Sequence, residues 1–416
     1  MKRNRWFYAA VGVIVLLFAG LIYAWSVLSR PLAQYFTEWT SAQLSLTFTI
    51  CMTFFCLGGV LAGFLSGRIN AKFNLAASAF LFLAGFFLAA KTSSLAGLYI
   101  GYGILAGTGS GFAYNTIMGT VTKYFPDKPG LISGILLMGF GIGSFIIGKV
   151  YQAYTGPGEG WRTSFEIFGI LLFAVMILSA FFLKAPEGGK EDGDKNGAGA
   201  AEGIGKKAAA AEMAGKSSAS EIIDMAPAAM LKRSSFWLYF IWAVLLCAAG
   251  LAVISQAGGM VLEVSPDISA GTVSTVVGLI SIFNGIGRVL FGGLFDKIGR
   301  VKTMVLNEIL FCVALGLLIL SLMTGILPAL VAGFMIMGLA YGGVPTTNSA
   351  FVGAFYGKKN YSVNFSLLNL NLIFSSFGGT VAGLLYDASG SYFSTLTAML
   401  GAVIVGIFIA VMIKRP

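Results

Sequence analysis

The sequence has no histidine, and charged residues make up only 11% of its 416 positions. Soluble domains carry about 25% charged residues, so this composition excludes an ordinary soluble domain. Without imidazole there is no histidine-based metal site or proton relay and no Ser–His or Cys–His pair. All the cysteines sit inside apolar runs, where simple packing is expected of them, at Cys51, Cys56, Cys247 and Cys312. We therefore expect no enzyme, no cofactor and no metal site.

Long apolar runs dominate what is present. Hydrophobic residues make up 57% of the chain, and the mean hydropathy is +0.86. About 20 apolar residues cross the hydrocarbon core, and lipid cannot satisfy free backbone groups, so each run predicts a transmembrane helix. Twelve spans are predicted, at about 6–28, 43–65, 75–91, 95–119, 131–152, 164–183, 234–255, 270–295, 303–323, 326–350, 362–386 and 391–413. The expected fold class is an all-α membrane protein with twelve transmembrane helices in the lipid bilayer.

The formal net charge of +10 lies mainly in the short loops between these spans. That distribution is typical of a membrane protein and does not indicate nucleic-acid binding. With both termini on one side, and the long central loop left out, the loops of that side hold fourteen lysines and arginines. The opposite loops hold four, namely Arg30, Lys91, Lys149 and Arg162. Because positive charge stays inside, both termini are predicted to be cytoplasmic.

A charged segment divides the chain into two similar halves. Residues 184–232 are rich in Ala, Gly, Lys and Glu and predict a flexible cytoplasmic linker. The flanking regions, 1–183 and 233–416, are each expected to form a six-helix bundle. Short sequences recur between the halves at an offset of about 230 residues, as in 63–68 and 292–297. A constant offset argues for duplication, and two parallel six-helix repeats are a known transporter architecture.

The loop after the eighth span reads GGLFDKIGRVK over residues 292–302. Its glycines allow close helix approach, and its acid can pair with basic residues or with a helix N-terminus. The stretch resembles the loop motif G-x-L-x-D-[RK]-x-G-[RK]-x-[RK] of the major facilitator superfamily, and this resemblance implies two pseudo-symmetric six-helix bundles. The first-half copy is degraded, with Gly67 in place of the acid and Asn70 in place of the second glycine. The expected gating residues are Gly292, Asp296, Lys297, Gly299 and Arg300.

Further segments are similar to the oxalate/formate antiporter and bacterial monocarboxylate transporter group. They are residues 23–27, 124–130, 230–237 and 345–349. Animal monocarboxylate transporters carry an acid where Asn284 stands, so the bacterial branch fits better. The resemblance implies alternating access, a small organic anion as substrate, protons as coupling ion, and a monomer in the bacterial inner membrane.

Arg288 can be interpreted without the family. It lies eight residues before Asp296 at the end of its span, which places it about 12 Å into the membrane at 1.5 Å per residue. An unpaired arginine at that depth costs at least about 2.5–3.5 kcal/mol and normally marks a substrate or ion path. Ser281 and Asn284 share its helix face. Since a guanidinium holds a carboxylate bidentately, Arg288 is the candidate substrate-binding residue, with Asn284 beside it.

The rest of the predicted lining depends on the resemblance. It implies that the substrate chamber is lined by Tyr23, Tyr114 and Tyr341, whose rings and hydroxyls suit a small acid with a short tail. Ordinary helix packing is the alternative for each of them. Asn348 shares a helix face with Tyr341 and joins the predicted lining. Leu368 occupies the place where oxalate-carrying relatives have a lysine, and it is expected to face the cavity.

Glu308 lies about six residues into the ninth span, roughly 9 Å deep. It is either a proton carrier or the partner of a cytoplasmic basic residue. Three functions are therefore considered: proton-coupled monocarboxylate transport, oxalate/formate-type exchange, and a membrane sensor or enzyme on a transporter-like scaffold. The third is disfavoured because the sequence shows no nucleotide-binding loop, metal cluster or nucleophile–histidine pair.

Overall fold

The computed structural model describes residues 5–66, 68–156, 158–183 and 224–414, and these residues form helices, turns and loops with no strand. The expected flexibility of the central linker concerns residues 184–223 for the most part and lies outside the described residues. The all-helical fold class is confirmed for the part of the chain that the structure describes.

The helices of the first half run without long loops. They are α1 (Arg5–Ala19), η1 (Gly20–Ala24), α2 (Trp25–Tyr35), α3 (Ser41–Leu65), α4 (Ala71–Lys91), α5 (Leu95–Leu98), η2 (Tyr99–Ala106), α6 (Gly107–Val121), η3 (Thr122–Tyr124), α7 (Pro129–Tyr154) and α8 (Gly160–Phe182). In the second half they are α9 (Pro227–Leu231), α10 (Ser234–Val264), α11 (Ala270–Ile298), α12 (Arg300–Thr324), α13 (Leu327–Tyr356), α14 (Tyr361–Asn369), α15 (Asn371–Ser375), α16 (Phe377–Ser389) and α17 (Phe393–Met412).

Eleven of the described helical stretches are long and apolar enough to cross a membrane. The predicted span without such a helix is the fourth, at 95–119, where the π-helical η2 separates α5 from α6 and leaves no single long α-helix. The span predicted at 362–386 is also interrupted, at Leu370 and Ser376, between α14, α15 and α16. Many large apolar side chains are exposed, as lipid contact requires; Phe73, Phe181 and Phe408 are 69%, 70% and 68% exposed.

Local signals explain where several helices begin and end. Thr40 and Gln43 form a capping box that starts α3. Gly325 and Gly390 adopt left-handed conformations with φ of 71° and 70° and end α12 and α16. Gly299, with φ of 76°, forms the sharp turn between α11 and α12, and this backbone conformation favours glycine at that motif position.

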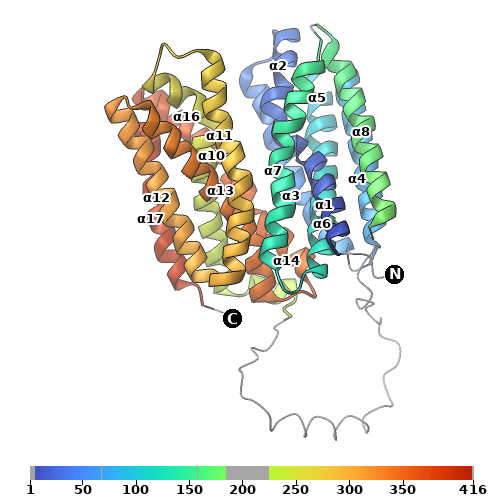
Figure 1. Ribbon diagram of the computed structural model, residues 1–416. Coiled ribbons are helices and arrows are strands. Elements are labelled where there is room, and N and C mark those ends of the chain that lie inside the picture. Colours follow the sequence, from blue (N-terminus) through green and yellow to red (C-terminus); the bar gives the residue numbers. More distant parts are fainter. Residues whose placement is uncertain (1–4, 67, 157, 184–223, 415–416) are drawn as a thin grey trace, which may run out of the picture.

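Figure 1 shows α1–α8 and α10–α17 as two groups of helices that stand side by side, with both chain ends on the same side. The groups meet mainly where α7 packs against α11. Glycines make this contact close: a Cβ atom at Gly134 would lie 2.3 Å from the carbonyl oxygen of Arg288, and one at Gly130 would lie 2.4 Å from that of Gly292. We call the contact of these four residues the α7–α11 seam.

The end of the predicted linker docks on the second half. Asp224 Oδ1 accepts hydrogen bonds from the backbone N–H groups of Lys358 and Lys359, at 2.8 Å and 3.0 Å. The Met225 N–H donates to the carbonyl oxygen of Tyr356 at 2.9 Å, and the Met225 side chain is buried. The segment from Asp224 into α9 therefore lies along the turn between α13 and α14, where these hydrogen bonds hold it.

Candidate functional site

A chamber of about 300 Å³ lies between the two groups of helices. Both halves contribute to its wall, which is formed by Tyr23, Ala24, Val27, Gly141, Phe145, Leu251, Ile254, Val277, Ile280, Ser281, Asn284, Arg288 and Tyr341. Most of these side chains are apolar, and the polar ones gather around Arg288. A mostly apolar cavity with a few polar groups that fix orientation is the usual form of a small-molecule site.

Arg288 is held at the base of this chamber by neutral oxygen atoms. Its Nε donates to Asn284 Oδ1 at 2.9 Å, one helical turn away on α11. Its Nη1 donates to the carbonyl oxygen of Leu137 on α7, in the other half. Gly141 makes room for the guanidinium, because a Cβ atom there would lie 3.0 Å from Arg288 Cζ. Arg288 is 7% exposed, so its charge is held in a largely dehydrated setting that spans both halves.

No acid neutralises this charge within the described part of the chain. The ion pairs of the described residues lie elsewhere, between Arg5 and Asp127, Lys91 and Glu166, and Arg162 and Glu159. A buried cation whose partners are neutral oxygens lacks a counter-charge. The chamber can therefore receive one negative charge next to Arg288.

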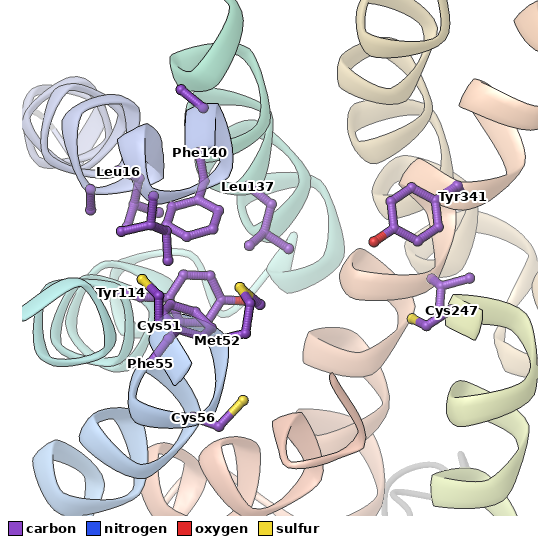
Figure 2. Close-up of a cluster of buried hydrophobic side chains, with 14 of the residues drawn as sticks. Leu16, Cys51, Met52, Phe55, Cys56, Tyr114, Leu137, Phe140, Cys247 and Tyr341 are labelled. Atoms are coloured by element: carbon purple, nitrogen blue, oxygen red, sulfur yellow. The ribbon is translucent and has the colours of Figure 1, made fainter. Parts of the chain in front are cut away.

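The predicted tyrosines are divided between the chamber and the helix contacts below it. Tyr23 and Tyr341 line the chamber, from opposite halves. Tyr114 does not line it, and its ring packs against Phe55, Phe140 and Phe365 at centroid distances of 5.2 Å, 5.0 Å and 5.8 Å. Figure 2 shows Tyr114 within an apolar cluster of the first half, whereas Tyr341 lies across the gap beside Cys247.

Asn348 and Leu368 are also separated from the chamber wall. Asn348 is 1% exposed, and its Oδ1 accepts a hydrogen bond from the Tyr239 hydroxyl at 3.0 Å inside the second half. Leu368 is fully buried in the hydrophobic core, not turned toward the cavity as expected. The reason is that α14 packs against α3 and α6 of the first half, so this part of the helix is enclosed by its neighbours.

On the side of the chain termini the two halves are tied together. Both carboxylate oxygens of Asp296 accept backbone hydrogen bonds from the start of α7, from Gly130 N at 2.9 Å and Leu131 N at 2.8 Å. A carboxylate at this place satisfies free N–H groups and favours the positive end of the helix dipole. The chamber wall extends from Arg288 toward Val277, away from Asp296, so the chamber opens on the side opposite the termini.

The remaining motif residues lie at the contact between the halves, at the surface, or within the second half. Gly292 belongs to the α7–α11 seam, and Lys297 is exposed at the end of α11. Gly299 forms the turn before α12 described above. Arg300 donates to the carbonyl oxygens of Ala410 and Ile413, at 3.1 Å and 2.9 Å, and so ties the start of α12 to the end of α17.

Glu308 lies inside the second half and does not reach the chamber. It is fully buried, and its Oε1 accepts a hydrogen bond from Trp242 Nε1 at 2.6 Å. Its Oε2 has no hydrogen-bond partner among the described residues. The alternative expectation of a cytoplasmic basic partner is wrong, because the side chain points toward α10 in the bundle interior.

Several residues that sequence reasoning missed connect the halves. The Ser349 hydroxyl donates to Ser133 Oγ at 2.7 Å, and Asn115 Nδ2 donates to the carbonyl oxygen of Ser362 at 3.0 Å. The spacing of Gly130, Gly134 and Gly141 on one helix could have indicated the α7–α11 seam. The serines and the asparagine carried no such signal, because polar residues are common in transporter helices.

Comparison with known proteins agrees with this architecture. The family model described as the Major Facilitator Superfamily matches residues 7–265 and 247–416. The MFS-type transporter YhjX of Escherichia coli is 24% identical over 370 residues, which cover 89% of this chain and 85% of YhjX. The oxalate:formate antiporter of Oxalobacter formigenes is 26% identical over a region that covers 86% of this chain and 80% of the antiporter. Monocarboxylate transporter 12 of Mus musculus is 32% identical over a region that covers 34% of this chain and 28% of the mouse protein.

Solved structures of sugar transporters share the fold at low sequence identity. FucP in its outward conformation superposes with a TM-score of 0.69 at 15% identity, over 98% of this chain and 99% of FucP. The proton:xylose symporter XylE gives a TM-score of 0.71 at 13% identity, over 99% of this chain and 96% of XylE. With the family model matched along nearly the whole chain, the protein belongs to the Major Facilitator Superfamily and is a membrane transporter of that fold.

Proposed function

We propose that this transporter carries small monocarboxylates of the lactate, acetate or formate type by alternating access, coupled to protons. The observation that carries the proposal is the chamber wall, in which Arg288 is the one charged side chain among the described residues. A guanidinium that lacks an acidic partner offers a planar fork to a carboxylate, with bonds about twice as strong as neutral ones. The apolar wall suits a short hydrocarbon tail.

Two conformations are needed to move such an anion across the bilayer. In the present one the α7–α11 seam and Asp296 close the side of the termini, while the chamber opens on the other side. We propose that a substrate bound at Arg288 weakens the guanidinium contact to Leu137 and so permits the seam to open. The positive charge of the termini side supports a cytoplasmic location for both termini, in a bacterial inner membrane, with the monomer as the working unit.

An oxalate/formate-type anion exchanger is the second candidate. The similarity to an oxalate:formate antiporter over 86% of this chain favours it. A dianion, however, would leave one charge unpaired beside Arg288 in a low-dielectric chamber, at a penalty of several kcal/mol. Oxalate-carrying relatives have a lysine, a second cation, at the place of Leu368. Leu368 carries no charge and lies outside the chamber wall.

Competition between anions separates the two candidates. Unlabelled lactate or formate should inhibit uptake of the labelled monocarboxylate into proteoliposomes, and oxalate at the same concentration should inhibit it at least tenfold less. The physical reason is that, among the described lining residues, Arg288 alone carries a positive charge and can neutralise one carboxylate but not two. Oxalate that competes at equal or lower concentration than lactate would overturn the monocarboxylate assignment and support the exchanger.

Glu308 supplies a test of proton coupling. A fully buried carboxylate without a cationic partner is costly in its ionised form, so we propose that Glu308 holds a proton in this conformation. Glu308→Gln keeps the shape and the Trp242 contact but removes the exchangeable proton. We expect counterflow of labelled monocarboxylate to persist, while accumulation driven by a proton gradient is lost. Gradient-driven accumulation at the wild-type level would exclude Glu308 as the proton carrier.

A further inference from the structure

A second cavity lies beyond the chamber, at the end of the first half that is opposite the termini. Its volume is about 370 Å³, and it is lined by α2, by Tyr151 near the end of α7, and by Thr155, Gly156 and Gly158 of the loop that follows. Val27 lines both this cavity and the chamber, so the two spaces adjoin along α2. Arg30, Pro31 and Gln34 follow Val27 at i+3, i+4 and i+7 and therefore continue the same helix face outward.

Arg30 is the cation of this outer cavity, and it makes neither a hydrogen bond nor an ion pair with any described residue. The other outer cations of the first half are engaged differently. Lys91 pairs with Glu166 at 2.7 Å, and Arg162 donates to the carbonyl oxygens of Ala90 and Thr92. An arginine with no protein partner, on the wall of a cavity that adjoins the substrate chamber, is available to an anion.

An acid beside this cavity, Glu159, already has hydrogen-bond partners. Glu159 accepts a hydrogen bond from the Tyr35 hydroxyl at 2.5 Å and from Arg162 Nε at 3.4 Å. The Tyr35 hydrogen bond, with help from the Arg162 charge, lowers the pKa of Glu159, so the acid is ionised near neutral pH. Its charge is balanced by Arg162, and Arg30 keeps its own. A further cation, Lys149, stands 6.0 Å from the ring of the chamber residue Phe145 and adds to the positive potential next to the chamber.

We propose that Arg30 forms an outer anion site, at which the carboxylate of an incoming substrate binds before it passes to Arg288. This inference rests on the proposed function, since it concerns the same anionic substrate. Arg30 lies seven residues beyond Tyr23, which lines the chamber with Arg288, so the two levels are separated by about 10 Å along the helix. A small monocarboxylate is shorter than this separation and engages the two arginines in turn.

Substitution of Arg30 with measurement of influx kinetics tests the outer site. Arg30→Gln should lower Vmax/KM for influx about three- to tenfold through a higher KM, with Vmax at saturating lactate or formate unchanged, because a charge at the rim acts on capture. Arg30→Lys keeps the charge and should stay within about twofold of wild type. The influx of Arg30→Gln should also depend less on salt between low and physiological ionic strength, where the Debye length falls to about 8 Å.

Lys91→Gln is the matched control, because it removes one outer positive charge that lies away from both cavities and is paired with Glu166. Its influx kinetics should equal those of wild type. The outer site would be overturned if Arg30→Gln leaves KM unchanged, or if Lys91→Gln lowers Vmax/KM for influx by as much. The proposed function would still stand in that case, provided that the wild-type protein takes up the monocarboxylate. Wild-type protein that takes up neither lactate, acetate nor formate would overturn both.

Discussion

Arg288→Ala should reduce uptake of labelled monocarboxylate by about a hundredfold or more. The variant loses two charge-assisted hydrogen bonds to the substrate carboxylate, which together are worth about 3 kcal/mol or more. The variant should still fold. Arg288 donates to two neutral acceptors, Asn284 Oδ1 and the carbonyl oxygen of Leu137, so its removal leaves no unpaired charge buried in the protein. Initial uptake rates in proteoliposomes, measured beside the elution profile and thermal unfolding of the purified protein, check the expectation.

Arg288→Lys provides the matched comparison. It keeps the positive charge, but a lysine ammonium is a compact point charge that lacks the bidentate fork and cannot hold both Asn284 and the substrate in one plane. We expect it to restore less than about a tenth of the wild-type rate. Near wild-type uptake by the alanine variant would remove Arg288 from the binding site. Full rescue by lysine would show that charge alone is sufficient.

The second large effect is expected at the α7–α11 seam. A Cβ atom at Gly134 would lie 2.3 Å from the carbonyl oxygen of Arg288 and 3.0 Å from Val289 Cα, both in the opposite half. These are backbone atoms that cannot move aside singly, so Gly134→Ala forces the halves apart at this level. Overpacking of this kind costs about 1–3 kcal/mol, which shifts a two-state equilibrium about five- to 150-fold toward the state in which the seam is open.

Two measurements test this shift. Uptake by Gly134→Ala should fall about tenfold or more, and a cysteine placed at Ser281 in the chamber should react more slowly with an impermeant thiol reagent added on the chamber-open side. The native cysteines Cys51, Cys56 and Cys247 are buried and add little background.

Gly293→Ala, next to the seam on α11, is the control. A Cβ atom there meets only Leu131 Cδ1 at 3.8 Å, which is ordinary contact, so uptake and labelling should be unchanged. If Gly134→Ala labels and transports like wild type, or if Gly293→Ala loses as much activity, close glycine packing does not hold the seam shut.

How far sequence reasoning reached can be judged from individual residues. The spans and the class followed from apolar run length, a property of consecutive residues that lipid imposes on any chain. Arg288 and Asn284 followed from helical spacing and from the cost of a charge at depth, and both line the chamber. The family resemblance also placed Tyr114 and Leu368 in the predicted chamber lining. The structure instead packs both side chains between helices.

The sequence by itself determined the membrane class, the helical fold and Arg288 as a charged residue of the chamber, because each depends on local composition and helix period. Only the tertiary structure decided which side of the chamber is open, that Asp296 caps α7, that Leu137 holds Arg288, and that Arg30 stands in a cavity next to the chamber. These features arise where the two groups of helices meet. Contacts of that kind depend on the relative placement of faces that are more than a hundred residues apart in the chain, as in the 151-residue separation of Leu137 and Arg288.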